Sequence, residues 1–73
     1  MASVDVESEV TGNVWKVLLE EGAEVVEGDV IMILESMKME IPVEAPAAGR
    51  VSKIHVAPED QVEEDQVVAV IET

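Results

Sequence analysis

Apolar and polar residues alternate in several short stretches of the chain, and glycine or proline separates most of these stretches. Alternation with a period of two residues predicts β-strands that bury one face. The segment 14–21 also fits two turns of an amphipathic helix, but its shortness and the flanking Gly12 and Gly22 favour a strand. The pattern therefore predicts six strands, at residues 4–7, 14–20, 29–35, 40–45, 51–56 and 66–72.

The second half of the chain repeats the first half. Residues 12–35 align with residues 49–72 without a gap, so that Gly12 meets Gly49 and Val14 meets Val51. Each half alone is too small to close a core. We therefore expect one domain over residues 1–73, made of pseudo-repeats 1–36 and 38–73 that pack sheet to sheet about an approximate twofold axis.

The repeat differs at two turns. Glu59 and Asp65 stand where the first half has Gly22 and Gly28. Aspartate tolerates the left-handed conformation of a turn better than most residues, whereas glutamate tolerates it less well. This substitution predicts a rearranged turn at Glu59.

The composition supports an all-β fold. Fifteen valines and five isoleucines, against three leucines and one aromatic residue, favour a pleated sheet over a helix. With 73 residues the chain forms one small domain. It has no cysteine and a single histidine, which excludes a disulfide framework and a histidine-cluster metal site.

The charge narrows the range of partners. Seventeen acidic residues against four basic ones give a formal charge of −13, which disfavours binding to nucleic acid or to an anionic membrane and favours a monomer. The longest apolar run, residues 30–34, is far too short to span a bilayer, and the first ten residues do not resemble a signal peptide. We expect a soluble, cytoplasmic protein.

The two pseudo-repeats meet at Lys38. Strands 29–35 and 40–45 are close enough in sequence to form an antiparallel hairpin, with residues 36–39 as its turn and Met37 and Lys38 in the central positions. Such turns favour Asn-Gly or Asp-Gly, because both central residues take positive φ. A departure from this rule at the join of two repeats suggests a functional position.

An isolated lysine in a turn is usually only solvated, and methionine usually fills gaps in a core. Here the flanking Met37 and Met39 cannot both be core residues if they bracket the tip. The other two lysines, Lys16 and Lys53, are equivalent in the repeat and lie within strands. The reference pKa of lysine, about 10.4, makes a free amine rare at neutral pH. We therefore interpret Lys38 as a passive acceptor for a group that another enzyme activates.

The stretch Glu-Ser-Met-Lys-Met-Glu, residues 35–40, at the centre of a twofold-repeated chain resembles the biotinyl/lipoyl attachment domain. The resemblance covers the whole chain. It implies a flattened barrel or sandwich of two four-stranded antiparallel sheets with quasi-twofold symmetry, and an acceptor lysine, Lys38, on an exposed β-turn. The biotin branch of this family typically has Ala-Met-Lys-Met, whereas the lipoyl branch has Asp-Lys-Ala or Val-Lys-Ala. Met37 and Met39 match the biotin branch, and Ser36 stands in the place of its alanine.

The resemblance also implies a function. A biotin protein ligase would recognise the residues around the turn and join biotin, from biotinyl-adenylate, to Lys38 through an amide. The tethered ring would then carry carboxylate from a biotin carboxylase site to an acyl-CoA or keto-acid acceptor at a carboxyltransferase site. The domain itself would be a carrier without catalytic residues or metal. The residues expected to contact the ligase are Glu35, Ser36, Met37, Met39 and Glu40.

Two alternatives remain open at this point. The chain is a carrier of lipoate, or of both groups, since Glu35 and Ser36 also precede the lysine in some lipoyl acceptors. Alternatively, it is an unmodified β-barrel interaction module in which Lys38 has no special role. No nucleophile–base pair or phosphate-binding loop in the sequence supports an enzyme.

Overall fold

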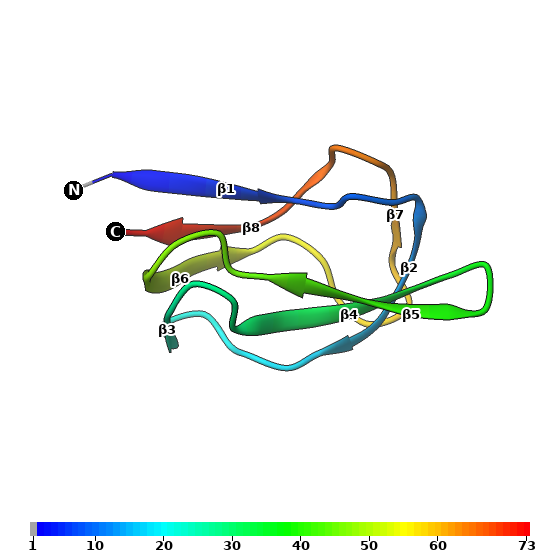
Figure 1. Cartoon of the computed structure of the whole chain (residues 1–73), viewed down its shortest axis with the longest axis horizontal. Coiled ribbons are helices and arrows are strands. Elements are labelled where there is room, and N and C mark those ends of the chain that lie inside the picture. The colour runs from blue at the N-terminus through cyan, green and yellow to red at the C-terminus, as the bar shows by residue number, and fades with distance from the viewer. Residues whose placement is uncertain (1) are drawn as a thin grey trace.

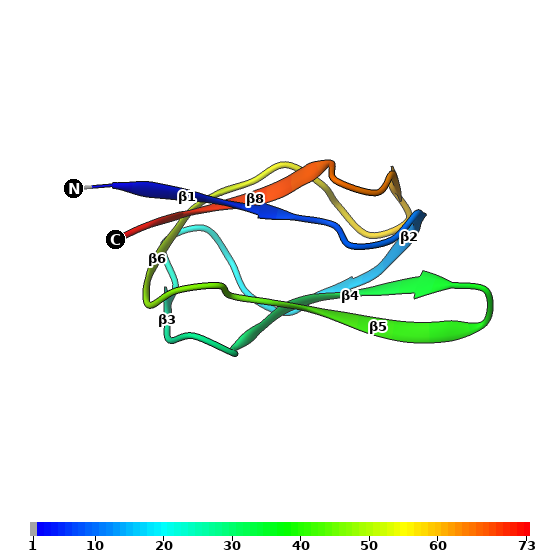
Figure 2. The same cartoon turned by 45° about the horizontal axis from the view of Figure 1, so that its top comes forward.

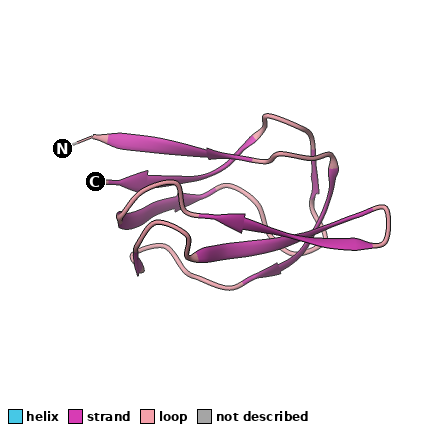
Figure 3. Ribbon diagram, viewed as in Figure 1, coloured by secondary structure: helices cyan, strands magenta, loops and turns pink. Residues whose placement is uncertain are grey.

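Eight β-strands joined by short turns make up residues 2–73, which are the residues that the computed structural model describes (Figures 1 and 3). Met1, the first residue of the first pseudo-repeat, lies outside this range. Within residues 2–73 there is no helix long and apolar enough to cross a membrane. The predicted all-β class is confirmed. The strands are β1 (Ser3–Glu7), β2 (Gly12–Val17), β3 (Glu24–Val25), β4 (Val30–Ser36), β5 (Met39–Glu44), β6 (Gly49–Ile54), β7 (Gln61–Val62) and β8 (Val67–Glu72).

The strands form two four-stranded antiparallel sheets, in the orders β1-β8-β6-β3 and β5-β4-β2-β7. The number of sheets and strands is as the resemblance implied. Each sheet keeps two edge strands, β1 and β3 in one and β5 and β7 in the other, so the fold is an open sandwich and not a closed barrel (Figure 2). Each sheet also takes two strands from each half of the chain. The expectation that the halves pack as two separate sheets is therefore wrong, because the halves interleave.

The sequence pattern missed two strands, β3 and β7. Each has only two residues, Glu24–Val25 and Gln61–Val62, which is too short for an alternation to be visible. Both nevertheless place a valine in the core, since Val25 and Val62 are almost fully buried. Each short strand forms one edge of its sheet: β3 pairs with β6, and β7 pairs with β2.

Branched aliphatic side chains from the two sheets form the core. Ile31, Leu34, Val51 and Ile71 are completely buried, as is Met32. Burying a side chain of this size contributes roughly 1.5–3 kcal/mol relative to leaving it exposed. Ser8 is the one buried polar residue among residues 2–73, and its hydroxyl donates to the Val10 carbonyl over 2.6 Å. The core is thus supplied by the Val and Ile content that predicted the fold class.

Equivalent backbone hydrogen bonds connect the two halves in both directions. The N–H of Gly22 donates to the carbonyl of Val51, and the N–H of Glu59 donates to the carbonyl of Val14. Glu59 adopts the same left-handed conformation as its counterpart, with φ of 78° against 95° at Gly22. The prediction of a rearranged turn at Glu59 is therefore wrong. The hydrogen bond to Val14 of the other half fixes the turn, and the glutamate accepts the unfavourable φ.

This geometry gives a stability prediction. We expect Glu59→Gly to stabilise the fold by roughly 0.5–1 kcal/mol, because glycine removes the cost of a left-handed φ. Its matched control is Gly22→Glu at the equivalent turn, which should destabilise the fold by about 1 kcal/mol. Urea unfolding of both variants measures the two shifts. Destabilisation by Glu59→Gly would show that the glutamate side chain, and not the turn conformation, matters at this position.

Candidate modification site

The hairpin of β4 and β5 forms one end of the molecule. The two strands pair in register up to the turn, with Ser36 opposite Met39 and Leu34 opposite Ile41. The molecule measures 36 × 19 × 18 Å, and the hairpin turn lies at the opposite end of the long axis from the two termini (Figure 1). The predicted hairpin, with its turn at residues 36–39, is confirmed.

The turn itself is a two-residue connection between Ser36 and Met39. Met37 and Lys38 both have positive φ, 50° and 65°, which is the conformation of a type I′ turn. Neither residue is glycine, asparagine or aspartate, so each pays a conformational cost of about 1 kcal/mol or more. The cost is tolerated because β4 and β5 pair directly on both sides of the turn.

The base of the hairpin is held from one side by the β1–β2 connection. The Ser36 hydroxyl donates to the carbonyl of Thr11 over 2.8 Å. Next to it, a Cβ on Gly12 would collide with the Glu35 carbonyl oxygen and lie 3.1 Å from the Ser36 Cβ. Gly12 therefore permits the close approach of β2 to the end of β4. Sequence reasoning identified Gly12 only as a repeat marker and did not identify Thr11, for which the sequence holds no signal.

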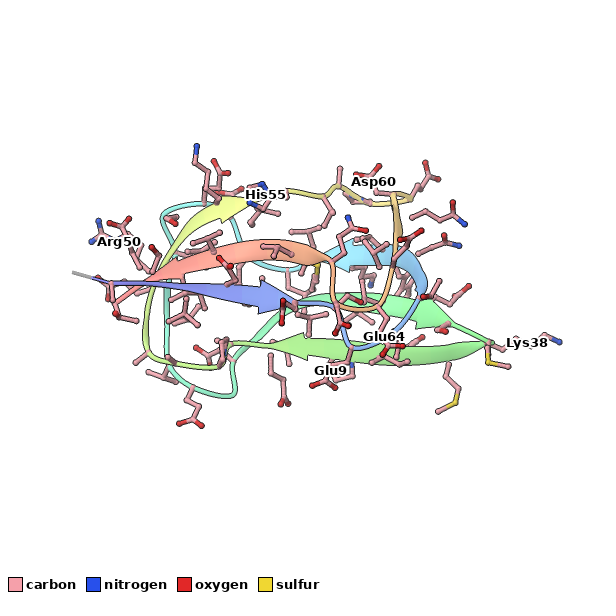
Figure 4. The ribbon with its side chains drawn as sticks, turned by 90° about the horizontal axis from the view of Figure 1, so that it is seen from above. Glu9, Lys38, Arg50, His55, Asp60 and Glu64 are labelled. Carbon is pink, nitrogen blue, oxygen red and sulfur yellow. The ribbon has the colours of Figure 1, made fainter. Side chains whose placement is uncertain are left out.

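The three residues at the tip are exposed. Met37 is 92% exposed and Met39 63% exposed, so the expectation that they do not both enter the core is confirmed. The Lys38 side chain projects beyond the end of the hairpin, away from the rest of the molecule (Figure 4). Among residues 2–73 the one ion pair is Arg50 with Glu24, at 3.9 Å, on other strands. The Lys38 amine is thus available to a partner, without a carboxylate in contact.

Two carboxylates flank the tip. Glu35 on β4 and Glu40 on β5 lie directly opposite each other, and both are exposed. Like charges in directly opposed positions destabilise a strand pair. Since pairing continues to Ser36 and Met39, the fold accepts this repulsion one position before the turn. The five residues expected to contact a ligase are therefore gathered around Lys38, on the last two positions of β4, the first two positions of β5 and in the turn.

The arrangement presents an amine at an exposed tip. No group of three or more metal-ligating side chains occurs within residues 2–73. Trp15 is 42% exposed on β2, and the Lys16 ammonium lies 4.4 Å from the centre of its ring. The two side chains therefore form a cation–π contact with each other. An exposed lysine at the end of a rigid, protruding hairpin fits a group attached through an amide bond, because nothing around it obstructs the attached group.

Comparison with known proteins supports this interpretation. A family model described as "Biotin-requiring enzyme" (Biotin_lipoyl) matches residues 1–73. The chain belongs to the biotinyl/lipoyl attachment family. In this family the domain is a non-catalytic carrier that occurs as part of carboxylases. The family that was inferred from residues 35–40 is thereby confirmed.

Two small relatives have nearly the length of this chain. The chain is 46% identical over 67 residues to the "Biotinylated protein TB7.3 homolog" of Mycobacterium leprae, which covers 92% of this chain and 94% of that protein. It is 40% identical over 60 residues to the "Biotin/lipoyl attachment protein" of Bacillus subtilis, with 82% of each chain covered.

Larger proteins contain the same domain. The structure of the urea carboxylase of Kluyveromyces lactis superimposes with a TM-score of 0.93 and 39% identity; the match covers 99% of this chain but only 6% of that chain. Pyruvate carboxylase of Bacillus subtilis matches 84% of this chain at 41% identity, within 5% of its own length. The biotinyl/lipoyl domain of this protein therefore corresponds to a small part of these carboxylases.

The strained turn gives a second stability prediction. We expect Met37→Asn to stabilise the biotinyl/lipoyl domain by about 1 kcal/mol, because asparagine suits the first central position of a type I′ turn. Met39→Asn is the matched control, since Met39 lies in β5 and has no positive φ. It should be neutral or destabilising. Thermal unfolding measures both, and equal effects of the two variants would contradict the assigned strain at Met37.

Proposed function

We propose that this chain is a biotin carboxyl carrier whose attachment residue is Lys38. The observation that carries the proposal is the position of this lysine in the turn of the β4–β5 hairpin, at the end of the long axis, between the exposed Met37 and Met39. The other two lysines, Lys16 and Lys53, lie within β2 and β6 on the body of the sandwich. Only Lys38 is presented at a protruding tip.

In the attachment reaction this chain contributes the Lys38 nucleophile and the fixed conformation of its turn. A biotin protein ligase supplies biotinyl-adenylate; the Lys38 nitrogen, after losing one proton, attacks its acyl carbon, AMP leaves, and a second proton is lost as the amide forms with one N–H remaining. The domain holds the Lys38 backbone in one conformation, so little conformational entropy is lost when the ligase binds the tip. When bound, biotin carries a carboxyl group between a biotin carboxylase site and a carboxyltransferase site.

The residues around Lys38 have separate roles in this proposal. Met37 and Met39 offer exposed, adaptable apolar contacts to the ligase. Glu35 and Glu40 offer paired negative charge to a cationic part of it. Ser36 holds the base of the hairpin through its bond to Thr11 and keeps the tip in place. Partners with biotin carboxylase and carboxyltransferase activity would meet the same tip, and the charge of −13 favours a monomeric carrier between these encounters.

Biotin is favoured over lipoate by Met37 and Met39 and by the relatives, which include a biotinylated protein and pyruvate carboxylase. The Bacillus subtilis relative named for both groups keeps lipoate as the second candidate.

Intact mass after incubation with a biotin protein ligase, ATP and biotin tests the proposal. We expect one biotin-sized increment on the wild-type protein and on Lys16→Arg and Lys53→Arg. Lys38→Arg keeps the charge but should show no increment. An increment that persists in Lys38→Arg would overturn the assignment, and a lipoyl-sized increment formed only with a lipoate ligase would favour the second candidate.

A further prediction concerns the methionines. We expect Met39→Asn to lower the kcat/KM of biotinylation by about tenfold or more, because it removes an apolar contact of the kind that dominates small interfaces. Met32→Leu, a completely buried methionine in β4, is the control and should leave the rate unchanged. Unchanged kcat/KM for Met39→Asn, with the fold intact by circular dichroism, would remove Met39 from the recognition site.

A further inference from the structure

Two shallow hollows adjoin on the side of the sandwich where the edge strands β1 and β5 lie. The larger, of about 330 Å³, has apolar residues of β4, β5 and the following turn in its wall, among them Ile41, Pro42 and Pro46. The smaller, of about 260 Å³, follows the end of β1. Both hollows share Glu7, Glu9, Glu44 and Pro46, so they form one continuous surface, which we call the twin groove.

The two hollows are lined by equivalent positions of the two pseudo-repeats. Every residue that lines the smaller hollow has its counterpart, at a shift of 37 residues, in the lining of the larger one. Glu7 and Glu44 are each other's counterparts, and they lie where the two hollows meet. Val6 and Val43 are also identical counterparts, and the halves have diverged at the remaining positions. Four polar residues of the smaller hollow have apolar or glycine counterparts in the larger one: Asp5 with Pro42, Ser8 with Ala45, Glu9 with Pro46 and Asp65 with Gly28.

The twin groove carries negative charge without compensation. Six carboxylates line it, and neither hollow is lined by lysine, arginine or histidine. The basic residues of the body lie on or beside β2 and β6, and the one ion pair in residues 2–73 involves Arg50, outside the groove. A second copy of this chain is an unsuitable occupant, because it brings the same negative charge. The carboxylates of the groove are Asp5, Glu7, Glu9, Glu27, Glu44 and Asp65.

We propose that the twin groove docks an extended segment of a partner protein in which basic and aliphatic side chains alternate. Successive side chains of an extended segment point in opposite directions, so one set can contact Ile41, Pro42 and Pro46 while the other reaches the carboxylates. Side chains carry most of this contact, since Pro42 offers no N–H for pairing along the β5 edge. The site does not include Lys38 and goes beyond the proposed carrier function.

The expected contact is weak and depends on salt. All six carboxylates are exposed, and exposed ion pairs contribute little individually and are screened at physiological ionic strength. The apolar part is also limited, because Leu34, Val43 and Ala45 are already buried in the domain. A transient contact of this kind raises the rate of encounter with a cationic partner without holding the carrier in place.

The test uses a short synthetic peptide in which arginine and leucine alternate, titrated into the full chain and followed by amide chemical shifts. We expect shifts at residues 5–9 and 41–46, in wild type and in Lys38→Ala alike. Binding in Lys38→Ala separates this proposal from the carrier function, because that variant cannot be modified at the tip. Shifts confined to the tip or spread over the whole surface would overturn the twin groove.

Charge-matched variants test the specificity. Glu7→Gln with Glu44→Gln should weaken binding by about tenfold, whereas Glu20→Gln with Glu72→Gln changes the charge equally outside the groove and should weaken it less than about twofold. Equal losses would show attraction by net charge alone and overturn the proposal.

The apolar half of the groove is tested by a second peptide, in which arginine and serine alternate. It should bind at least about fivefold more weakly than the arginine–leucine peptide, and Ile41→Thr should reduce the affinity of the arginine–leucine peptide towards that level. Equal affinities for the two peptides would contradict docking of aliphatic side chains and overturn the proposal.

Discussion

The structure depends on the exchange of strands between the two halves of the chain. Neither half forms a sheet by itself: each sheet takes two strands from each half, and reciprocal backbone hydrogen bonds from Gly22 to Val51 and from Glu59 to Val14 connect them. Partial formation of one half would leave edges and core valines exposed to water. We therefore expect the domain to fold as one cooperative unit. This coupling is also what allows single turns to remain in unfavourable conformations.

The cost of such conformations is concentrated at few positions. Four residues other than glycine have positive φ within residues 2–73: Met37, Lys38, Glu59 and Asp65. Glu59 and Asp65 occupy turns that the fold itself requires, since their counterparts Gly22 and Gly28 have the same conformation. The two-residue turn between β4 and β5 also requires positive φ at Met37 and Lys38, but the sequence places neither glycine nor asparagine there. At the hairpin tip the sequence accepts strained turn residues and opposed carboxylates, and the residues that cause these costs are Lys38, the proposed attachment residue, and its neighbours.

The sequence was sufficient to predict the fold class and the hairpin turn that contains Lys38. Valine and isoleucine content, the repeat and the short spacing across residues 36–39 predicted β-strands and a hairpin with Lys38 in its turn, and both are present. The two-residue strands β3 and β7 were not predictable, because an alternation needs more residues to be seen. The interleaving of the halves was also missed, since a repeat in sequence does not say whether strands pair within or between copies. The bond from Ser36 to Thr11 joins residues 25 positions apart, and no local pattern indicates it.

The end of the sandwich opposite Lys38 is the twofold image of the hairpin tip. Ser3 lies opposite Glu72 there, as Glu40 lies opposite Glu35 at the tip, and the N–H of Thr73 donates to the carbonyl of Ala2 over 2.8 Å. A two-residue link between these neighbouring positions would create a second hairpin of the same form. The two ends of the sandwich thus have the same strand pairing, and a circularly permuted chain with a lysine in the new two-residue link would present that lysine at the end opposite Lys38.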